Sequence, residues 1–254
     1  MLEVAKLTRY FGGLGAVVDL DFSVTEGVVG LVGPNGSGKT TVLNLVSGLL
    51  RPTRGAVRFR GQSITRCAPH VIAMRGMART YQLSTFFPGL TARDNVAVAT
   101  LCGQPLGVLG ACVGVRSSRK ADEGARRRAG EMLERVGLLQ YADTLAQNLP
   151  YGHQRRLGVA MALATRPSLL LLDEPMCGMT QGEKGEMGEL IRAIRREGVS
   201  IVLVEHDMRV VAGLCDRVIV LNFGRKIFEG SAEDMLREPE VLEAYLGRDE
   251  SDAA

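Results

Sequence analysis

The chain has 254 residues, of which 46% are hydrophobic and 23% charged, and its formal net charge is +3. This composition excludes a disordered chain, and so mild a charge gives no case for nucleic acid as the main partner. The five cysteines are scattered and form no C-x-x-C pair, so they indicate neither a disulfide framework nor a zinc site and fit a reducing compartment.

Short β-branched runs alternate with helical patterns along the chain, which predicts an α/β fold. The predicted strands are residues 3–9, 16–24, 28–32, 169–172, 201–204 and 218–221. The predicted helices are residues 40–49, 92–101, 120–136 and 183–196. The first two strands suggest an antiparallel flank on a mostly parallel sheet.

Strand patterns disappear between about residues 84 and 147, so we expect a helical subdomain inserted into the α/β core. One domain, 1–247, is expected, with the core formed by 1–83 and 148–247, the insert by 84–147 and a frayed tail by 248–254. The charge-free run 96–115 is long enough to cross a membrane. Gln104, Pro105 and several glycines interrupt it, so a helix that ends near Leu101, followed by a mobile apolar loop, is predicted instead.

The strongest motif is a phosphate loop, G-x-x-x-x-G-K-[ST], directly after the apolar strand 28–32. Its residues are Gly33, Pro34, Asn35, Gly36, Ser37, Gly38, Lys39 and Thr40, and we include the adjacent Thr41 in the predicted site. The glycines let successive backbone N–H groups face the phosphates. Lys39 is expected to reach the β and γ oxygens, and the Thr40 hydroxyl is expected to join the shell of a Mg²⁺ ion.

Two further apolar runs also end in polar side chains, at the strand edge where open α/β sheets bind ligands. Asp173 and Glu174 follow the run 169–172, and His206 comes two residues after the run 201–204. We expect Asp173 to hold Mg²⁺, directly or through water, and Glu174 to act as general base on the water that attacks the γ-phosphate. His206 is expected to hydrogen-bond the γ-phosphate or that water.

Gln82 stands where the core meets the helical insert. We interpret it as a side chain that senses Mg²⁺ and the attacking water and couples the two parts. In isolation this glutamine would carry no meaning, and its interpretation depends on the motifs around it.

Together these residues resemble the ATP-binding cassette (ABC) family, and the match covers nearly the whole chain. The family has a P-loop NTPase core of the RecA type with ATP and Mg²⁺ as cofactors. By this resemblance Phe11 stacks on adenine, with Tyr10 as its alternative, while Gln82, Asp173, Glu174 and His206 take the family's positions. The signature segment that meets a partner's ATP corresponds here to Tyr151, Gly152 and His153.

The signature and the loop after Glu174 both depart from the common family pattern. Pro150 replaces the usual serine, and we expect it at the first position of a helix whose positive end faces the partner's γ-phosphate. His153 replaces a glutamine and is expected to be neutral. Thr180 stands where many members carry an aspartate. With the ending V-L-E-A-Y-L-G, these features resemble the branched-chain amino-acid importer ATPases, and the urea-importer ATPases share similar features.

The resemblance implies an ATPase that works at the cytoplasmic face of the cell membrane with two permease subunits and a second cassette, identical or paralogous. An extracytoplasmic solute-binding protein would be an indirect partner, and no nucleic acid is expected. A soluble cassette ATPase without a transported substrate, a phosphate-loop GTPase or kinase, and an ATP-gated scaffold are the alternatives. No N-K-x-D guanine-reading sequence occurs, and Glu174 and His206 argue against a scaffold.

Overall fold

The structure, a computed structural model, describes residues 1–80, 86–101 and 114–246, without side-chain detail for 114–122 and 246. Three sequence-based predictions therefore lie outside the described residues: Gln82, the loop after Leu101 and the tail 248–254. For the rest of the chain the elements can be compared directly with those expected.

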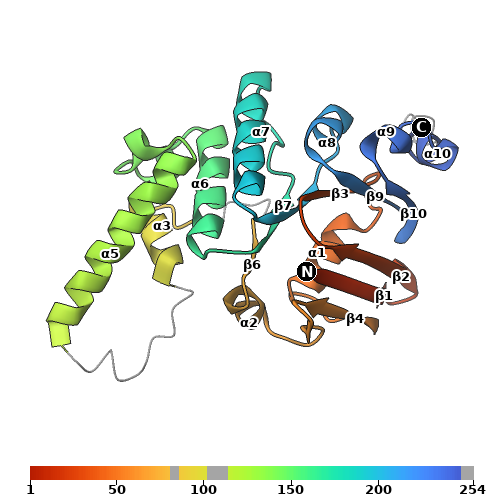
Figure 1. The fold of residues 1–254 in the computed structure, drawn as a ribbon, viewed down its shortest axis with the longest axis horizontal. Coiled ribbons are helices and arrows are strands. Elements are labelled where there is room, and N and C mark those ends of the chain that lie inside the picture. The colour runs from red at the N-terminus through yellow and green to blue at the C-terminus, as the bar shows by residue number, and fades with distance from the viewer. Residues whose placement is uncertain (81–85, 102–113, 247–254) are drawn as a thin grey trace.

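The described strands form two sheets (Figure 1). One is antiparallel with the order β2-β1-β4-β5, and the other has the order β10-β9-β3-β8-β7-β6. In the first sheet the bounds are Leu2–Phe11 for β1, Leu14–Val24 for β2, Arg54–Phe59 for β4 and Gln62–Ser63 for β5. In the second they are Val28–Val32 for β3, Met77–Arg79 for β6, Leu169–Asp173 for β7, Ser200–Val204 for β8, Arg217–Asn222 for β9 and Arg225–Gly230 for β10.

The second sheet is parallel except for β10, which pairs antiparallel with β9. The predicted antiparallel flank therefore exists, but it is a separate sheet and not the edge of the parallel one. The flank also contains β4, a strand that the sequence analysis did not identify and that pairs antiparallel with β1.

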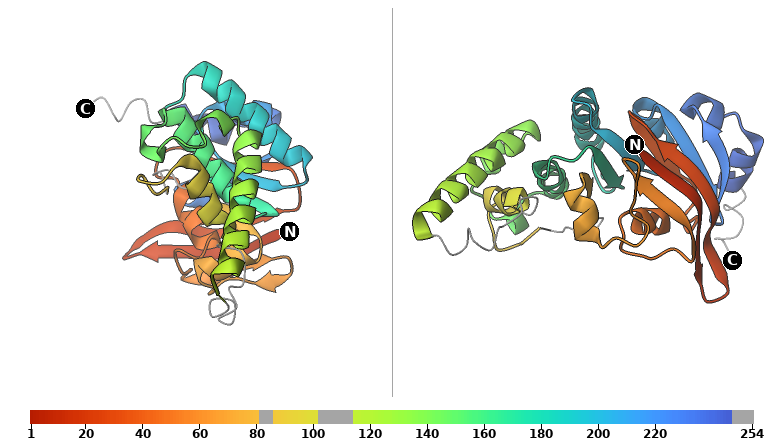
Figure 2. Two further views of the ribbon diagram at one scale, coloured as in Figure 1. Left: turned by 90° about the vertical axis from the view of Figure 1, so that its left-hand side faces the viewer. Right: turned by 60° about the horizontal axis from the view of Figure 1, so that its bottom comes forward.

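The helices divide into a group beside the parallel sheet and a group at one end of the molecule, where α3, α5 and α6 pack together (Figures 1 and 2). Their bounds are Lys39–Val46 for α1, Pro69–Met74 for α2, Ala92–Leu101 for α3, Gly114–Arg135 for α5, Tyr151–Ala164 for α6, Gln181–Arg196 for α7, Met208–Leu214 for α8, Ala232–Met235 for α9 and Pro239–Leu246 for α10. Short 3₁₀ helices cover Leu139–Tyr141 and Ala146–Asn148.

Helix bounds differ from the prediction where local backbone chemistry intervenes. Helix α1 ends at Val46, three residues early, because Gly48 takes the left-handed conformation (φ 78°) that stops a helix. Helix α7 begins two residues before the predicted start because Thr180 and Glu183 form a reciprocal capping box around its first turn. Helix α5 begins six residues before the predicted residue 120, whereas α3 has the predicted bounds.

The parallel sheet has a separate core on each face, as the alternation of β7 shows. Leu169 and Leu171 pack with α1 and the antiparallel sheet, while Leu170 and Leu172 pack with the helical side of the molecule. A strand buried on both faces needs a continuous apolar run, which is why this segment is four leucines. Because β8 pairs in parallel with both β3 and β7, the carboxyl ends of these three strands lie side by side at one edge of the sheet.

Candidate nucleotide-binding site

The phosphate loop connects the carboxyl end of β3 to the first turn of α1, as its sequence predicted. Gly33 has φ 144°, and a Cβ there would collide with the carbonyl oxygen of Leu221 on neighbouring β9. Lys39 is buried, and its Nζ donates hydrogen bonds to the carbonyl oxygens of Gly33 (2.7 Å) and Pro34 (2.8 Å). The ammonium group is therefore held inside the curl of the loop, where phosphate oxygens bind in such motifs.

A cavity of ≈290 Å³ opens over this loop. Its lining includes seven predicted site residues, namely Asn35, Gly36, Gly38, Lys39, Thr40, Thr41 and Glu174. The remaining lining residues are Leu14, Gly15, Ala16, Phe223 and Gly224, which the sequence analysis did not assign to the site. The tertiary fold thus brings the start of β2 and the turn between β9 and β10 to the edge of the phosphate loop.

Asp173 ends β7 and is 3% exposed, and it forms an ion pair with Arg79 of β6 (2.9 Å). Burial raises the pKa of the Asp173 carboxyl, although the hydrogen bond and the charge of Arg79 oppose the shift. Arg79 also donates to Asn44 Oδ1 on α1 (2.7 Å) and to Oγ of Ser47, the residue directly after α1 (3.1 Å). The sequence analysis missed Arg79 as a site residue, because a single charged residue in a three-residue strand carries no pattern.

One oxygen of Asp173 fits a metal ion. Its Oδ1 is buried and has no hydrogen-bond partner among the described residues. No group of three or more His, Cys, Asp or Glu in the described part of the chain could hold a metal alone. A Mg²⁺ ion, which takes few protein ligands and shares phosphate oxygens and water, suits this sparse donor set of one carboxylate and the hydroxyl of Thr40.

Glu174 and His206 follow neighbouring strands β7 and β8. Glu174 has the left-handed φ of 47°, which is uncommon for a residue with a side chain, and its N–H donates to the Val204 carbonyl oxygen (3.0 Å). The side chain of His206 is 56% exposed, and its Nδ1 lies 3.9 Å from Glu205 Oε2. Both predicted groups thus stand at the same sheet edge as the phosphate loop.

Glu205 is a second residue that sequence reasoning missed. It is 1% exposed, and its Oε1 accepts a hydrogen bond from the Met176 N–H (3.0 Å). Burial raises the pKa of this carboxyl, with the Met176 and His206 interactions opposing the shift. The only sequence signal is an acidic residue that continues the apolar run of β8. Its bond ties the loop after Glu174 to the segment that carries His206.

We expect Glu205→Ala to lower the free energy of unfolding by about 1–3 kcal/mol, because the buried Met176 N–H then loses its acceptor. Glu205→Gln retains an acceptor oxygen at the same place and is expected to lose less. Urea denaturation of both variants checks this. Equal losses in the two variants would contradict it and would assign the effect to charge instead of the hydrogen bond.

The signature segment begins α6, with one correction. Pro150 is the residue before the helix and not its first member, because its ψ of 151° is extended and the first helical residue is Tyr151. Gly152 is buried, and a Cβ there would collide with the carboxylate of Glu183. Burial and the charge of Arg156 lower the pKa of His153, so this imidazole is neutral at pH 7.

The loop after Glu174 packs directly against the signature within one chain. Gly178 has φ 75°, and a Cβ there would lie 3.0 Å from Cε1 of Tyr151. Tyr151 itself is 46% exposed, with the Arg155 guanidinium 4.9 Å from its ring centroid. Tyr151 of the signature and Gly178 of the loop after Glu174 are therefore complementary in shape.

Phe11, expected to stack on adenine, lies at the end of β1 and is 44% exposed. The Arg9 guanidinium stands 4.7 Å from the centroid of its ring. Phe11 is not among the residues that line the cavity over the phosphate loop. Tyr10, the alternative, packs its ring against Gly15 of the adjacent strand.

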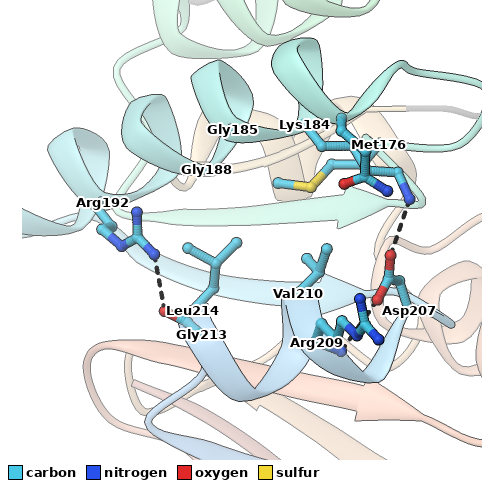
Figure 3. A pocket seen from close by; sticks show the side chains of 11 residues that line it. Met176, Lys184, Gly185, Gly188, Arg192, Asp207, Arg209, Val210, Gly213 and Leu214 are labelled. Carbon is cyan, nitrogen blue, oxygen red and sulfur yellow. Dashed lines mark hydrogen bonds and ion pairs between the residues drawn. The ribbon is translucent and has the colours of Figure 1, made fainter.

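A larger cavity, ≈450 Å³, lies outside this site, between α7 and α8 (Figure 3). Lys184 and Asp207 form an ion pair across it (2.9 Å), and farther along the two helices Arg192 donates to the Gly213 carbonyl oxygen (3.2 Å). Lys184 lowers the pKa of Asp207 by its hydrogen bond. Asp207 follows His206, and Lys184 lies in the first turns of α7, so this pair joins the segment after β8 to the helix that follows β7.

No helix in the described part of the chain has the length and apolar character needed to cross a membrane.

The comparison with known proteins agrees with this geometry. Residues 17–177 match the model of the ABC transporter family, and residues 225–251 match that of the branched-chain amino acid ATP-binding cassette transporter. The chain is 39% identical over 249 residues to the high-affinity branched-chain amino acid transport ATP-binding protein LivG of Escherichia coli (strain K12), covering 97% of this chain and 98% of that protein.

Two solved structures are also similar. The ADP conformation of an ATP-binding cassette of an ABC transporter superposes with a TM-score of 0.85 at 27% identity, covering 98% of this chain and 99% of the other. A dimeric post-hydrolysis cassette bound to ADP and phosphate has a TM-score of 0.78 at 25% identity, covering 91% and 99%. With phosphate loop, paired carboxylates, histidine and signature in one fold, the chain belongs to the ABC transporter family and is an ATP-binding cassette ATPase.

Proposed function

We propose that this chain hydrolyses MgATP to power an importer of branched-chain, hydrophobic amino acids. The observation that carries the proposal is the single cavity that joins the phosphate loop to Glu174. The cargo class rests on the similarity to LivG along almost the whole chain and on the family match of residues 225–251.

In this proposal the described residues divide the chemistry of phosphoryl transfer among them. Lys39 and the amides from Gly33 to Gly38 hold the phosphates. Thr40 and Asp173 hold Mg²⁺, which supplies charge neutralisation on the phosphate oxygens. Glu174 takes the proton from the attacking water.

Two further side chains complete the assignment. His206 donates a hydrogen bond to the γ-phosphate or the water, and its exposed position beside Glu205 leaves the imidazole free to turn toward a bound nucleotide. Gln82, outside the described residues, senses Mg²⁺ and transmits its state to the helical insert 84–147.

The working unit is two cassettes with ATP between them. The signature residues Tyr151, Gly152 and His153 of one cassette cover the phosphate loop of the other, so ATP binding closes the pair and hydrolysis releases it. The second cassette is a paralogue or another copy of this chain. The half-exposed Tyr151 at the start of α6 supports this role, because a large aromatic residue at such a position suits an interface.

An apolar groove of ≈380 Å³ supports the coupling to a permease. It runs between the core elements α2 and β6 and the helices α3 and α6, with Ile72, Met77, Val98 and Met161 among its lining. A cytoplasmic amphipathic helix of the permease would bury its apolar face there. The cassette would thus act at the cytoplasmic face of the membrane, with the solute-binding protein as an indirect partner and no role for nucleic acid.

Affinity purification of the tagged chain from its native membranes tests the assignment. We expect two permeases and a second cassette to co-purify, and the reconstituted complex to import leucine, isoleucine and valine with ATP. Uptake of urea in place of these amino acids would overturn the cargo class, and ribosomal or DNA-repair partners without a permease would overturn transport.

Met161→Glu, which places a charge in the groove, is expected to retain ATPase activity of the isolated chain while it loses the permeases. Leu236→Glu is the matched control, since Leu236 is 48% exposed at the end of α9 and does not line the groove. Equal recovery of permeases with both variants would contradict the proposal that a permease helix binds in this groove.

His153 gives a prediction on pH. Because burial and Arg156 lower its pKa, the imidazole stays neutral at and above pH 7, and it gains charge only as the pH falls below its reference value of about 6.5. We expect His153→Gln to leave the shape of the ATPase pH profile between pH 7 and 8.5 unchanged. A profile that flattens in this range would show that His153 titrates there and would contradict the assignment of a neutral histidine.

A further inference from the structure

The cavity over the phosphate loop has an aromatic wall that the family resemblance does not account for. Phe223 lies in the two-residue turn between β9 and β10 and is 76% exposed, the most exposed of the large hydrophobic residues that the structure describes. It lines the cavity with Leu14, which is 72% exposed and is the first residue of β2, directly after the turn from β1. Two apolar side chains from distant hairpins thus border the nucleotide site.

The turn that carries Phe223 is hydrogen-bonded to the phosphate loop, which fixes the position of Phe223 beside the cavity. The Gly224 N–H donates to the Ser37 carbonyl oxygen (3.0 Å), and the Val18 N–H donates to the Gly224 carbonyl oxygen (2.8 Å). A Cβ at Gly224 would stand 2.7 Å from the carbonyl oxygen of Ala16. The hairpin, β2 and the phosphate loop therefore form one hydrogen-bonded unit.

Turn chemistry does not explain a phenylalanine here. Phe223 and Gly224 have φ angles of 44° and 76°, the pattern of a type I′ hairpin turn, in which asparagine or aspartate is favoured at the first of the two positions. A phenylalanine is disfavoured by this backbone conformation and by exposure to water alike. A residue that is unfavourable on both counts and borders a ligand cavity indicates a role in binding.

Phe11, the residue expected to stack on adenine, does not exclude a role for Phe223 in nucleoside binding. Phe11 does not line the cavity, and the Arg9 guanidinium already stands 4.7 Å from its ring centroid. The apolar contacts that the cavity itself offers to a base or ribose come from Leu14, Ala16 and Phe223. A nucleoside extending from phosphates held at Lys39 and Thr41 would meet these residues at the cavity rim.

We propose that Phe223, together with Leu14, forms a second apolar contact for the nucleoside part of the bound nucleotide, in addition to Phe11. This inference rests on the proposed nucleotide chemistry of the site and adds the residues that hold base and ribose. Because a phenyl ring contacts the face of a base and not its hydrogen-bonding edge, the contact holds adenine and guanine nucleotides alike.

The chain contains no tryptophan, so Phe223→Trp creates a single fluorescent reporter. We expect its emission to change saturably with MgADP and to stay constant with magnesium pyrophosphate, which carries no nucleoside. Leu236→Trp, exposed and away from the cavity, is the control and should respond to neither. A response to ATP without one to ADP would place the contact on the partner cassette and overturn the proposal.

Phe223→Asn separates binding from folding, because asparagine suits the left-handed turn and is expected to keep or raise the thermal stability. Calorimetry should show MgADP affinity reduced by about 5- to 100-fold, the range for loss of one aromatic stacking partner, with pyrophosphate affinity unchanged. ADP affinity within twofold of that of the unsubstituted chain would overturn the proposal. Absence of ADP binding by the unsubstituted chain would overturn the nucleotide chemistry of the site itself.

Discussion

Glu174→Gln is expected to lower the rate of ATP hydrolysis by about 10²–10⁴-fold, the usual contribution of a general base. The amide keeps the size of the side chain but cannot accept the proton of the attacking water. ATP binding should persist, since Lys39 and the loop amides are unchanged, and the closed pair of cassettes should accumulate. Phosphate release, nucleotide binding and sedimentation of the variant with MgATP measure the three effects.

The matched control is Glu189→Gln, an exposed glutamate of the same chain on α7. It makes the same chemical change outside the cavity, so its turnover should equal that of the unsubstituted chain. Unchanged turnover in Glu174→Gln would remove Glu174 from the role of base. Loss of ATP binding in this variant would instead assign the residue to nucleotide binding.

Arg79→Ala is expected to lower the free energy of unfolding by about 3–5 kcal/mol at pH 7, measured by urea denaturation without Mg²⁺. The ion pair is buried, with Arg79 5% and Asp173 3% exposed, so truncation of the arginine leaves a carboxylate without its compensating charge. Loss of the bonds to Asn44 and Ser47 adds to the cost. Arg126→Ala removes an exposed partner of Asp94 and should cost no more than about 1 kcal/mol.

The pH dependence distinguishes the charge effect from lost packing. Burial raises the pKa of Asp173 above its reference of 3.8, so this group favours the folded state at low pH and loses that contribution as the pH rises through the raised pKa. Arg79 holds this pKa down, and its removal raises it further. The cost of Arg79→Ala should therefore shrink as the pH is lowered toward 5. A cost that is the same at pH 5 and pH 7 would contradict an uncompensated charge at Asp173.

Local sequence patterns predicted the nucleotide chemistry that we propose for this protein. The phosphate loop is recognisable because the curl around phosphates needs glycines and a lysine at set positions, and strand β3 before it needs continuous apolar residues. Strand β7, which ends in Asp173, and strand β8, which precedes His206, were predictable for the same reason, since burial on two faces leaves an apolar run in the sequence.

Residues that are distant in sequence and contact each other in the fold showed no recognisable sequence pattern. Arg79 reaches Asp173 from a strand 94 residues away, and Glu205 holds the Met176 amide from 29 residues away. Arg79 and Glu205 are single charged residues without a sequence pattern. Their roles follow only from the tertiary contacts, because the buried Asp173 carboxylate needs a counter-charge and the buried Met176 N–H needs an acceptor. The pairing of β4 with β1 in the antiparallel sheet was likewise not predicted from the sequence.

The same division holds at the nucleotide cavity itself. The sequence by itself predicted which groups would contact phosphate, because their spacing is set by covalent geometry within one loop. Only the tertiary structure decided that Leu14 and Phe223 border the same cavity, since two hairpins separated by most of the chain meet there through hydrogen bonds at Ser37 and Val18. Contacts of this kind are set by packing between sheets, which no local pattern encodes.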